Sequence, residues 1–436
     1  MPAFVLILAV LLAACAGPSA QTRMSINQMV AAGDYKAAST RIEKEKDSGY
    51  GEKNSVLYYL DLAVVQHDAR QYQASNQSLA LAEQRMDDLY TKSVSREAGR
   101  FVVNDNTVQY AGERFERVLV NVYRAMNYLF LGARDSALVE ARKLSRLLQE
   151  YADTYGATRT AYKDDAFAQY VSGLIYADGG QPDDARISLE AAAKTYATWN
   201  SAFGTTRPTL EAPAGDDRMG ELVFVHANGV APRKVSQSFT VGWTQAVNVL
   251  RANSAAEPQG ALALSALRAG VTAQVITVSF PTYVQDSFSI AGSEIEVEGR
   301  AVPSELVYDV SAIAKKTLSE RETAIKVRAV TRATVKYLLR MLAVQECEKK
   351  LGKGALACSA LNLGGNIVAN VTEFADTRAW STLPSQFRMA RMRLAPGTYD
   401  VVVRYKSAAG ALVATRTLRA AIRPAERTYL HDRTAR

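Results

Sequence analysis

Apolar residues recur at helical spacing along residues 113–151, which show the clearest periodic pattern in the chain. A first helix is predicted from one apolar face, formed by Phe115, Val118, Leu119, Val122, Met126, Leu129 and Phe130. Gly132 interrupts the pattern, and a second helix is predicted from Ala137, Leu138, Ala141, Leu144 and Leu148. Two amphipathic helices joined by so few residues form an antiparallel pair. Such a pair leaves apolar surface uncovered, so neighbouring helices are expected.

Looser copies of this pair are spread over residues 26–199. In each copy a turn residue is followed five positions later by a small residue: Gly33 and Ala38, Arg70 and Ser75, Gly132 and Ala137, Gly180 and Ala185. The pattern resembles the tetratricopeptide repeat family, and Gly173 and Tyr176 occupy its small and aromatic positions in the last copy. Extra segments near 92–112 and 152–163 break the period, so a bundle of helical hairpins without superhelical register stays open as an alternative.

The composition of the chain changes after residue 199. Residues 200–220 contain several Gly and Pro residues with little periodic apolar content, and we interpret them as an interdomain linker. Residues 221–436 combine β-rich ends with helices expected at about 305–319 and 322–349. The predicted fold class is α+β and multidomain: a tetratricopeptide-like helical array, then an α+β domain with antiparallel strands and a long helix.

A short apolar run over residues 4–14 precedes Cys15. Its length suits the core of a signal peptide and is too short to span a bilayer. The sequence Leu12-Ala13-Ala14-Cys15 resembles the lipobox of bacterial lipoproteins. This resemblance implies a signal peptide over 1–14, lipidation of Cys15, a tether over 15–25, and attachment to the outer membrane facing the periplasm. An ordinary cleaved signal with an incidental Cys15 is the alternative, and the lack of Lys or Arg before the apolar run departs from both patterns.

The charge balance is basic and diffuse. Lys and Arg total 52 against 44 Asp and Glu, which gives a net charge of +8 at pH 7. This excess favours anionic neighbours such as phospholipid headgroups or cell-wall polymers. No concentrated basic patch with interleaved aromatic residues occurs, so nucleic acid is not an expected partner.

The cysteines and histidines give no metal or cofactor prediction. Cys347 and Cys358 can either form a disulfide in an oxidising compartment or stay as free thiols. His67, His226 and His431 are scattered along the chain, which argues against a metal site or a general-base arrangement. Nucleotide-binding, hydrolase and zinc-protease motifs are not found in the sequence.

A basic stripe is expected on the helix predicted at 322–349. Its members are spaced by four residues and therefore share one side of the helix: Arg328, Arg332, Lys336 and Arg340. Such a stripe suits lipid headgroups or an acidic partner. The alternative is a solvated face whose charges pair with carboxylates elsewhere in the fold.

Residues 374–384, FADTRAWSTLP, form the most specific local motif. Asp376 and Arg378 are placed to brace a loop or binding corner through charge-assisted hydrogen bonds, next to Trp380. With the GERFE helix start at 112–116 and the lipobox, this motif resembles an uncharacterised family of bacterial lipoproteins with tetratricopeptide-like repeats. The resemblance implies a link to cell-wall assembly, because such proteins are often encoded beside outer-membrane lipoproteins that act on penicillin-binding proteins. It supplies no catalytic residues, and a purely structural corner is the alternative.

These features favour a non-enzymatic, lipid-anchored envelope protein that serves as a scaffold or adaptor for other envelope proteins. A helical array binds partners through an extended surface. Two alternatives stay open. One is an envelope enzyme that acts on cell-wall or polysaccharide material between the two halves, and the other is a structural subunit of an export or assembly machine. The sequence leaves the partner and the oligomeric state undetermined.

Overall fold

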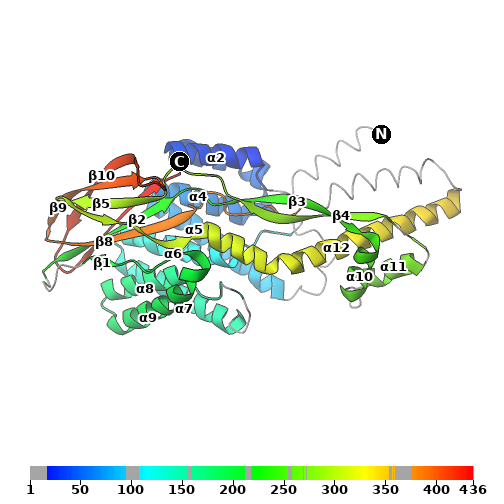
Figure 1. The fold of residues 1–436 in the computed structure, drawn as a ribbon, viewed down its shortest axis with the longest axis horizontal. Coiled ribbons are helices and arrows are strands. Elements are labelled where there is room, and N and C mark those ends of the chain that lie inside the picture. Colours follow the sequence, from blue (N-terminus) through cyan, green and yellow to red (C-terminus); the bar gives the residue numbers. More distant parts are fainter. Residues whose placement is uncertain are drawn as a thin grey trace.

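The computed structural model describes residues 17–94, 108–155, 160, 162–211, 218–253, 258–268, 270–271, 273–352, 356, 358 and 375–435. These residues form a layered body and an arm that projects from it (Figure 1). Helices dominate the N-terminal half and strands dominate the C-terminal half, so the predicted α+β class is confirmed. The expected signal peptide and Cys15 lie outside the described residues.

Helical hairpins form the first layer of the body. The paired helices are α2 (Ala20–Ala32) with α3 (Tyr35–Lys44), α4 (Ser55–Asp68) with α5 (Tyr72–Val94), α6 (Arg114–Phe130) with α7 (Arg134–Tyr155), and α8 (Ala166–Asp178) with α9 (Pro182–Phe203). Each predicted turn residue is left-handed, with φ of 77° at Gly33, 61° at Arg70, 70° at Gly132 and 66° at Gly180. This conformation ends the first helix of each pair and reverses the chain.

A central sheet forms the second layer. It contains β1 (Leu210–Glu211), β2 (Gly220–Asn228), β7 (Glu305–Asp309), β8 (Gln386–Leu394) and β11 (Arg427–Thr434), in the order β1-β8-β2-β11, with β7 also paired to β8. The β2–β8 and β7–β8 pairs are antiparallel, whereas β1–β8 and β11–β2 are parallel. The prediction of antiparallel strands is therefore incomplete, because two strands that return from distant parts of the chain pair in parallel.

An outer sheet forms the third layer. Its antiparallel strands are β5 (Gly292–Val297), β6 (Arg300–Pro303), β9 (Gly397–Lys406) and β10 (Leu412–Ile422), in the order β10-β9-β5-β6. Alternate residues of β2 face the two neighbouring layers. Val223 and Val225 join the core shared with the helices, whereas Leu222 and Phe224 join the core shared with the outer sheet. Burial on both faces explains why β2 is a continuous apolar run.

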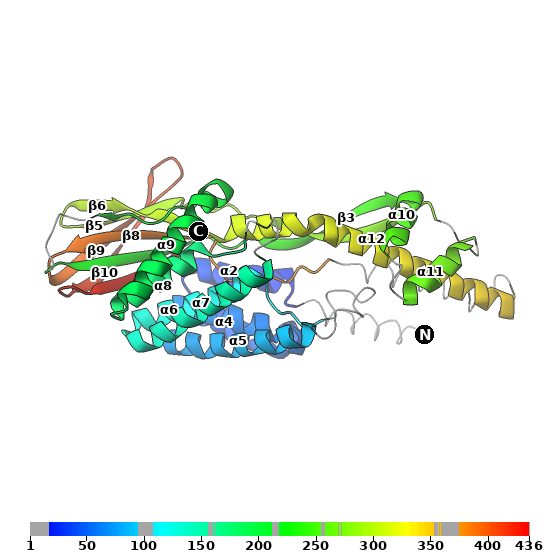
Figure 2. The same cartoon turned by 90° about the horizontal axis from the view of Figure 1, so that it is seen from below.

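The arm is built around one long helix, α12 (Val310–Leu351). The antiparallel hairpin of β3 (Arg233–Gly242) and β4 (Val275–Val284) lies along it, together with α10 (Trp243–Asn253) and α11 (Pro258–Arg268) (Figure 2). Beyond its start on the body, α12 contributes to two small cores, one with Ile276 and Val278 and one with Leu250 and Ala263.

Several predicted boundaries are wrong. The helices expected at 305–319 and 322–349 are a single helix, because the intervening Ser-Glu-Arg-Glu residues favour helix and nothing interrupts it. Residues 305–309 form β7, and the Asp309 side chain caps α12 by accepting from Ala312 N at 2.7 Å. The expected linker 200–220 contains β1, which pairs with β8 of the central sheet, so part of it belongs to the body.

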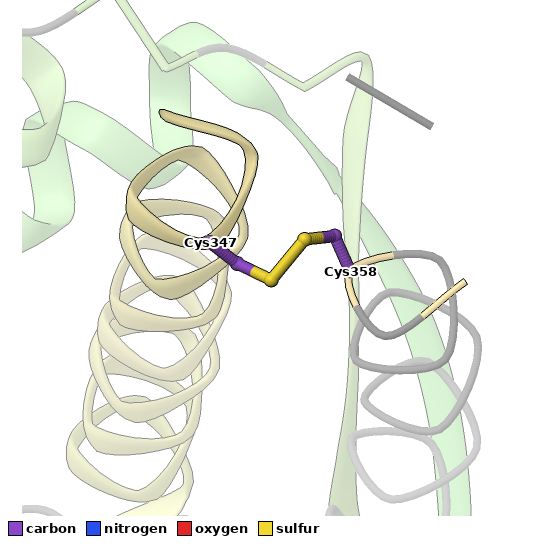
Figure 3. Close-up of a disulfide and its surroundings, with 2 residues drawn as sticks. All are labelled: Cys347 and Cys358. Atoms are coloured by element: carbon purple, nitrogen blue, oxygen red, sulfur yellow. A yellow bond between two sulfur atoms is a disulfide. The ribbon is translucent and has the colours of Figure 1, made fainter. Parts of the chain in front are cut away.

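A disulfide joins Cys347 of α12 to Cys358, near the far end of the arm (Figure 3). The sulfur atoms are 2.06 Å apart and the Cα atoms 5.7 Å apart. Of the two states that the sequence leaves open for these cysteines, the structure has the bonded one. The bond ties the end of α12 to the residues that follow it.

Candidate functional site

The predicted corner is docked against the helical layer. The Arg378 guanidinium donates to both carboxylate oxygens of Asp376, at 2.9 and 2.7 Å, and to the Val108 carbonyl at 2.7 Å. Its plane also lies over the Tyr110 ring at 5.3 Å. Arg378 is 3% exposed and Trp380 is 1% exposed. The brace expected between Asp376 and Arg378 is therefore present, and it faces the interior of the protein.

Glu116 connects this corner to the start of α6. Its carboxylate accepts from the backbone N–H of Trp380 at 2.9 Å and from that of Glu113 at 2.9 Å, and it also accepts from the Tyr110 hydroxyl. The contact to Glu113 is one half of a capping box at the start of α6. Burial, together with the neighbouring Glu113 carboxylate, raises the pKa of Glu116 to about 7. The two motifs that carry the family resemblance are thus hydrogen-bonded to each other.

Asp61 of α4 makes a second connection to the corner. Its buried carboxylate accepts from Thr382 N at 3.1 Å, from Thr382 Oγ1 at 3.0 Å and from the Tyr50 hydroxyl at 2.8 Å. Ser381 Oγ lies 3.3 Å from both carboxylate oxygens. Burial raises the pKa of Asp61 despite these donors. These contacts fix the loop to the helices, which favours a structural role for the corner.

Aromatic side chains fill the interface between the helices and the central sheet. Trp380 lies 5.8 Å from Tyr123, measured between ring centroids, and Phe167 stacks on Phe387 at 5.5 Å. Trp199 adds a further contact to the same cluster. The two halves of the protein therefore share one packed core at this interface.

The basic stripe is only partly solvated. Arg328 is exposed, Arg332 is 7% exposed, and Lys336 and Arg340 are half-buried, with the Arg340 guanidinium over the Tyr337 ring at 5.2 Å. Burial of Arg332 follows from its place between the arm hairpin and the corner. This stripe does not form the single exposed surface that its spacing predicts.

Arg328 and Arg332 line a cavity of about 350 Å³ between α12, the arm hairpin and the corner. The Lys234 ammonium lies here, 3.0 Å from Glu113, and Arg321 lies 3.2 Å from the same carboxylate. Burial alone would raise the pKa of Glu113, but these two cations lower it to about 2. The cavity therefore contains an ion-paired group and an excess of positive charge.

The structure brings together two histidines that are far apart in the sequence. His67 at the end of α4 and His431 in β11 lie 4.6 Å apart between ring centroids, with Asp68 beside them. His226 is buried in β2, where its Nε2 lies 2.7 Å from Thr434 Oγ1. No sequence signal joins His67 to His431, because only the return of β11 beside β2 brings them close.

Comparisons with known protein families, curated proteins and solved structures find no match for this chain. The resemblance to repeat-bearing lipoproteins therefore still rests on the motifs alone. Among the described helices, none has both the length and the apolar character needed to cross a bilayer.

Proposed function

We propose that this chain is a lipid-anchored, non-enzymatic adaptor of the bacterial cell envelope that binds other envelope proteins. The arm is the observation that carries this proposal. Its main helix, α12, has 42 residues, which corresponds to about 63 Å at the usual rise per residue. Only the first turns of α12 join the core of the body, through Val310, Ile313 and Ala314. Arg321 still forms an ion pair with Glu113 of the body, and the part of α12 beyond Arg332 extends away from the body in both views (Figures 1 and 2).

The arm has the construction of a stiff spacer. Its hairpin and short helices bury apolar residues against α12 in two successive cores. The Lys326 ammonium lies 4.3 Å from the centroid of the Phe280 ring, which adds a cation–π contact between α12 and β4. A packed arm of this kind holds its far end at a fixed distance from the body.

Three exposed apolar side chains lie in the outer part of the arm. Val275 at the start of β4 is 54% exposed, Leu351 at the end of α12 is 62% exposed, and Leu356 is 90% exposed. Exposed apolar groups in one region are more typical of a protein-contact surface than of a surface that faces only water. We place the partner contact of the adaptor here.

The remaining parts of the proposal come from the sequence. A lipid on Cys15 attaches the protein to the outer membrane, facing the periplasm. The turns between these hairpins resemble tetratricopeptide repeats in the sequence alone, and an array of that kind would offer a second, extended protein surface. The family resemblance favours partners involved in cell-wall assembly.

Site-specific photocrosslinking in intact envelopes tests the contact at the arm. A photoreactive residue at Leu351 or Leu356 is expected to crosslink to the same envelope protein. The matched control is Ile187 of α9, an apolar residue of the body that is 56% exposed. Leu351→Asp should abolish the crosslink from position 356. No specific product from either arm position, or an equal product from position 187, contradicts this placement.

Radiolabelled palmitate tests the anchor. The wild type should incorporate the label and Cys15→Ala should not. Cys347→Ser is the control, because that cysteine is in a disulfide and should not affect lipidation. Label in Cys15→Ala would refute the anchor and leave the arm contact to be judged separately by crosslinking.

A further inference from the structure

Three potential metal ligands meet where α4 joins β11. His67 and Asp68 are the last residues of α4, and His431 lies in β11. One ligand atom from each of the three lies within 4.8 Å of the other two, and all three residues are buried. They come from opposite ends of the chain, so the site exists only in the folded protein.

The tautomer of His67 is fixed by a chain of hydrogen bonds. Ser75 Oγ donates to the Ala63 carbonyl at 2.8 Å, so it accepts from Asn127 Nδ2 at 2.9 Å. Asn127 Nδ2 also donates to Asn76 Oδ1 at 2.9 Å. This orientation turns the Asn127 amide oxygen toward His67 Nδ1, 2.6 Å away, and Nδ1 must carry the proton. The lone pair of His67 is therefore on Nε2, and Asn127 supplies the oxygen acceptor that the other ring nitrogen of a metal-bound histidine usually has.

His431 Nδ1 lies 3.1 Å from the Tyr72 hydroxyl, which can accept the Nδ1 proton and so leave the lone pair of Nε2 for a metal ion.

Asp68 supplies an acceptor whose hydrogen-bonding capacity is unused. Its side chain is 0% exposed, and among the described residues neither carboxylate oxygen accepts a hydrogen bond. Arg433 Nε lies 3.2 Å from Oδ2 and forms an ion pair that offsets part of the buried charge, while another nitrogen of the same guanidinium donates to the Gly229 carbonyl at 2.6 Å. The lone pairs of Asp68 that have no donor are available to a metal ion, because a buried acceptor costs stability until it is satisfied.

We infer that His67, Asp68 and His431 bind one divalent transition-metal ion, with Zn²⁺ the best fit to two imidazoles and a carboxylate. Ligand atoms around tetrahedral Zn²⁺ are about 3.4 Å apart, so binding requires side-chain shifts of about 1 Å. The ion joins α4 of the helical layer to β11 of the central sheet. Its role is to fasten these two layers, independently of the adaptor function proposed above.

Equilibrium dialysis of the full chain, purified without a histidine tag and first treated with a chelator, tests this site. Metal analysis after dialysis against Zn²⁺ should find one tightly bound ion per chain. His67→Gln and His431→Gln should each weaken Zn²⁺ binding by at least about 100-fold, since even loss of a supporting residue commonly costs 10–100-fold. Co²⁺ should give the visible absorption of a tetrahedral site in the wild type and lose it in both variants.

His226→Gln is the matched control, because His226 is also buried but lies outside the cluster. It should retain wild-type Zn²⁺ affinity. Circular dichroism and thermal melting in chelator check that each variant is folded, and Asp68→Asn, which keeps the side-chain shape, replaces any variant that is not. Absence of a tight site in the wild type, or equal loss of affinity in His226→Gln, overturns the inference.

Discussion

Asp61 offers a direct measure of how strongly the corner is fixed to the helices. Two substitutions separate its hydrogen bonds from its charge. Asp61→Asn keeps the shape of the side chain and one acceptor oxygen, which can still face Thr382 N and Oγ1. The new amide group then faces the Tyr50 hydroxyl, which can rotate and accept from it. Asp61→Ala removes every one of these acceptors.

The two variants should differ in stability by several kcal/mol. In Asp61→Ala, the buried N–H of Thr382 and the buried hydroxyl of Tyr50 lose their acceptor. Each buried group left unsatisfied costs about 1–3 kcal/mol, so loss of the acceptor for these two groups should lower the free energy of unfolding by about 2–6 kcal/mol. Asp61→Asn loses little hydrogen bonding and no longer buries a charge, so its change should stay within about 1 kcal/mol.

Urea unfolding at pH 7, followed by tryptophan fluorescence, measures both effects, because Trp380 lies in the same corner. The wild type and both variants should unfold with similar dependence on urea, so that the shift in midpoint reports stability. The reasoning is refuted if Asp61→Asn is as unstable as Asp61→Ala. It is also refuted if neither variant changes the midpoint.

Two further predictions concern Glu116 and the disulfide. The folded pKa of Glu116, about 7, lies above the ordinary 4.5, so its protonation favours the folded state at low pH and this contribution is lost as pH rises through 7. The free energy of unfolding of the wild type should therefore fall between pH 5 and pH 8. In Glu116→Gln this fall should be smaller than in the wild type by up to about 3 kcal/mol, as measured by urea titrations at each pH. Reduction of the disulfide should cost the end of α12 up to about 3 kcal/mol of local stability, judged from the 11-residue separation of the cysteines. Hydrogen exchange near Leu351 should accelerate on reduction and in Cys347→Ser but stay unchanged in the body, and unchanged exchange at Leu351 would show that the bond is not needed there.

Local patterns predicted the local features of the fold. The four turn residues were recognised because a left-handed residue between two amphipathic helices leaves a repeated signature, even where the residue is Arg70. The brace between Asp376 and Arg378 was recognised because its partners are two residues apart. Both features depend on neighbours in the sequence, which a single chain displays directly.

Features formed by distant segments were not predicted. Strand β11 contains His431, Asp432 and Arg433, which a pattern of apolar and polar positions assigns to the surface. These residues are buried, with Arg433 paired to Asp68 and Asp432 to Arg416. The hydrogen bond from Trp380 to Glu116 and the meeting of His67 with His431 likewise depend on tertiary contacts that no local spacing encodes.

The position of β11 at the end of the chain also determines when the central sheet can fold during synthesis. Its partner β2 is made about two hundred residues earlier, and the two strands pair in parallel over their full length, from Arg427 with Glu221 to Thr434 with Asn228. Contacts between such distant segments form slowly, since a long loop must close first. Because the chain is synthesised from its N-terminus, its central sheet cannot be completed until the last strand, β11, has been made. Incomplete chains retain an open edge at β2, which favours delayed folding and the aggregation of truncated products.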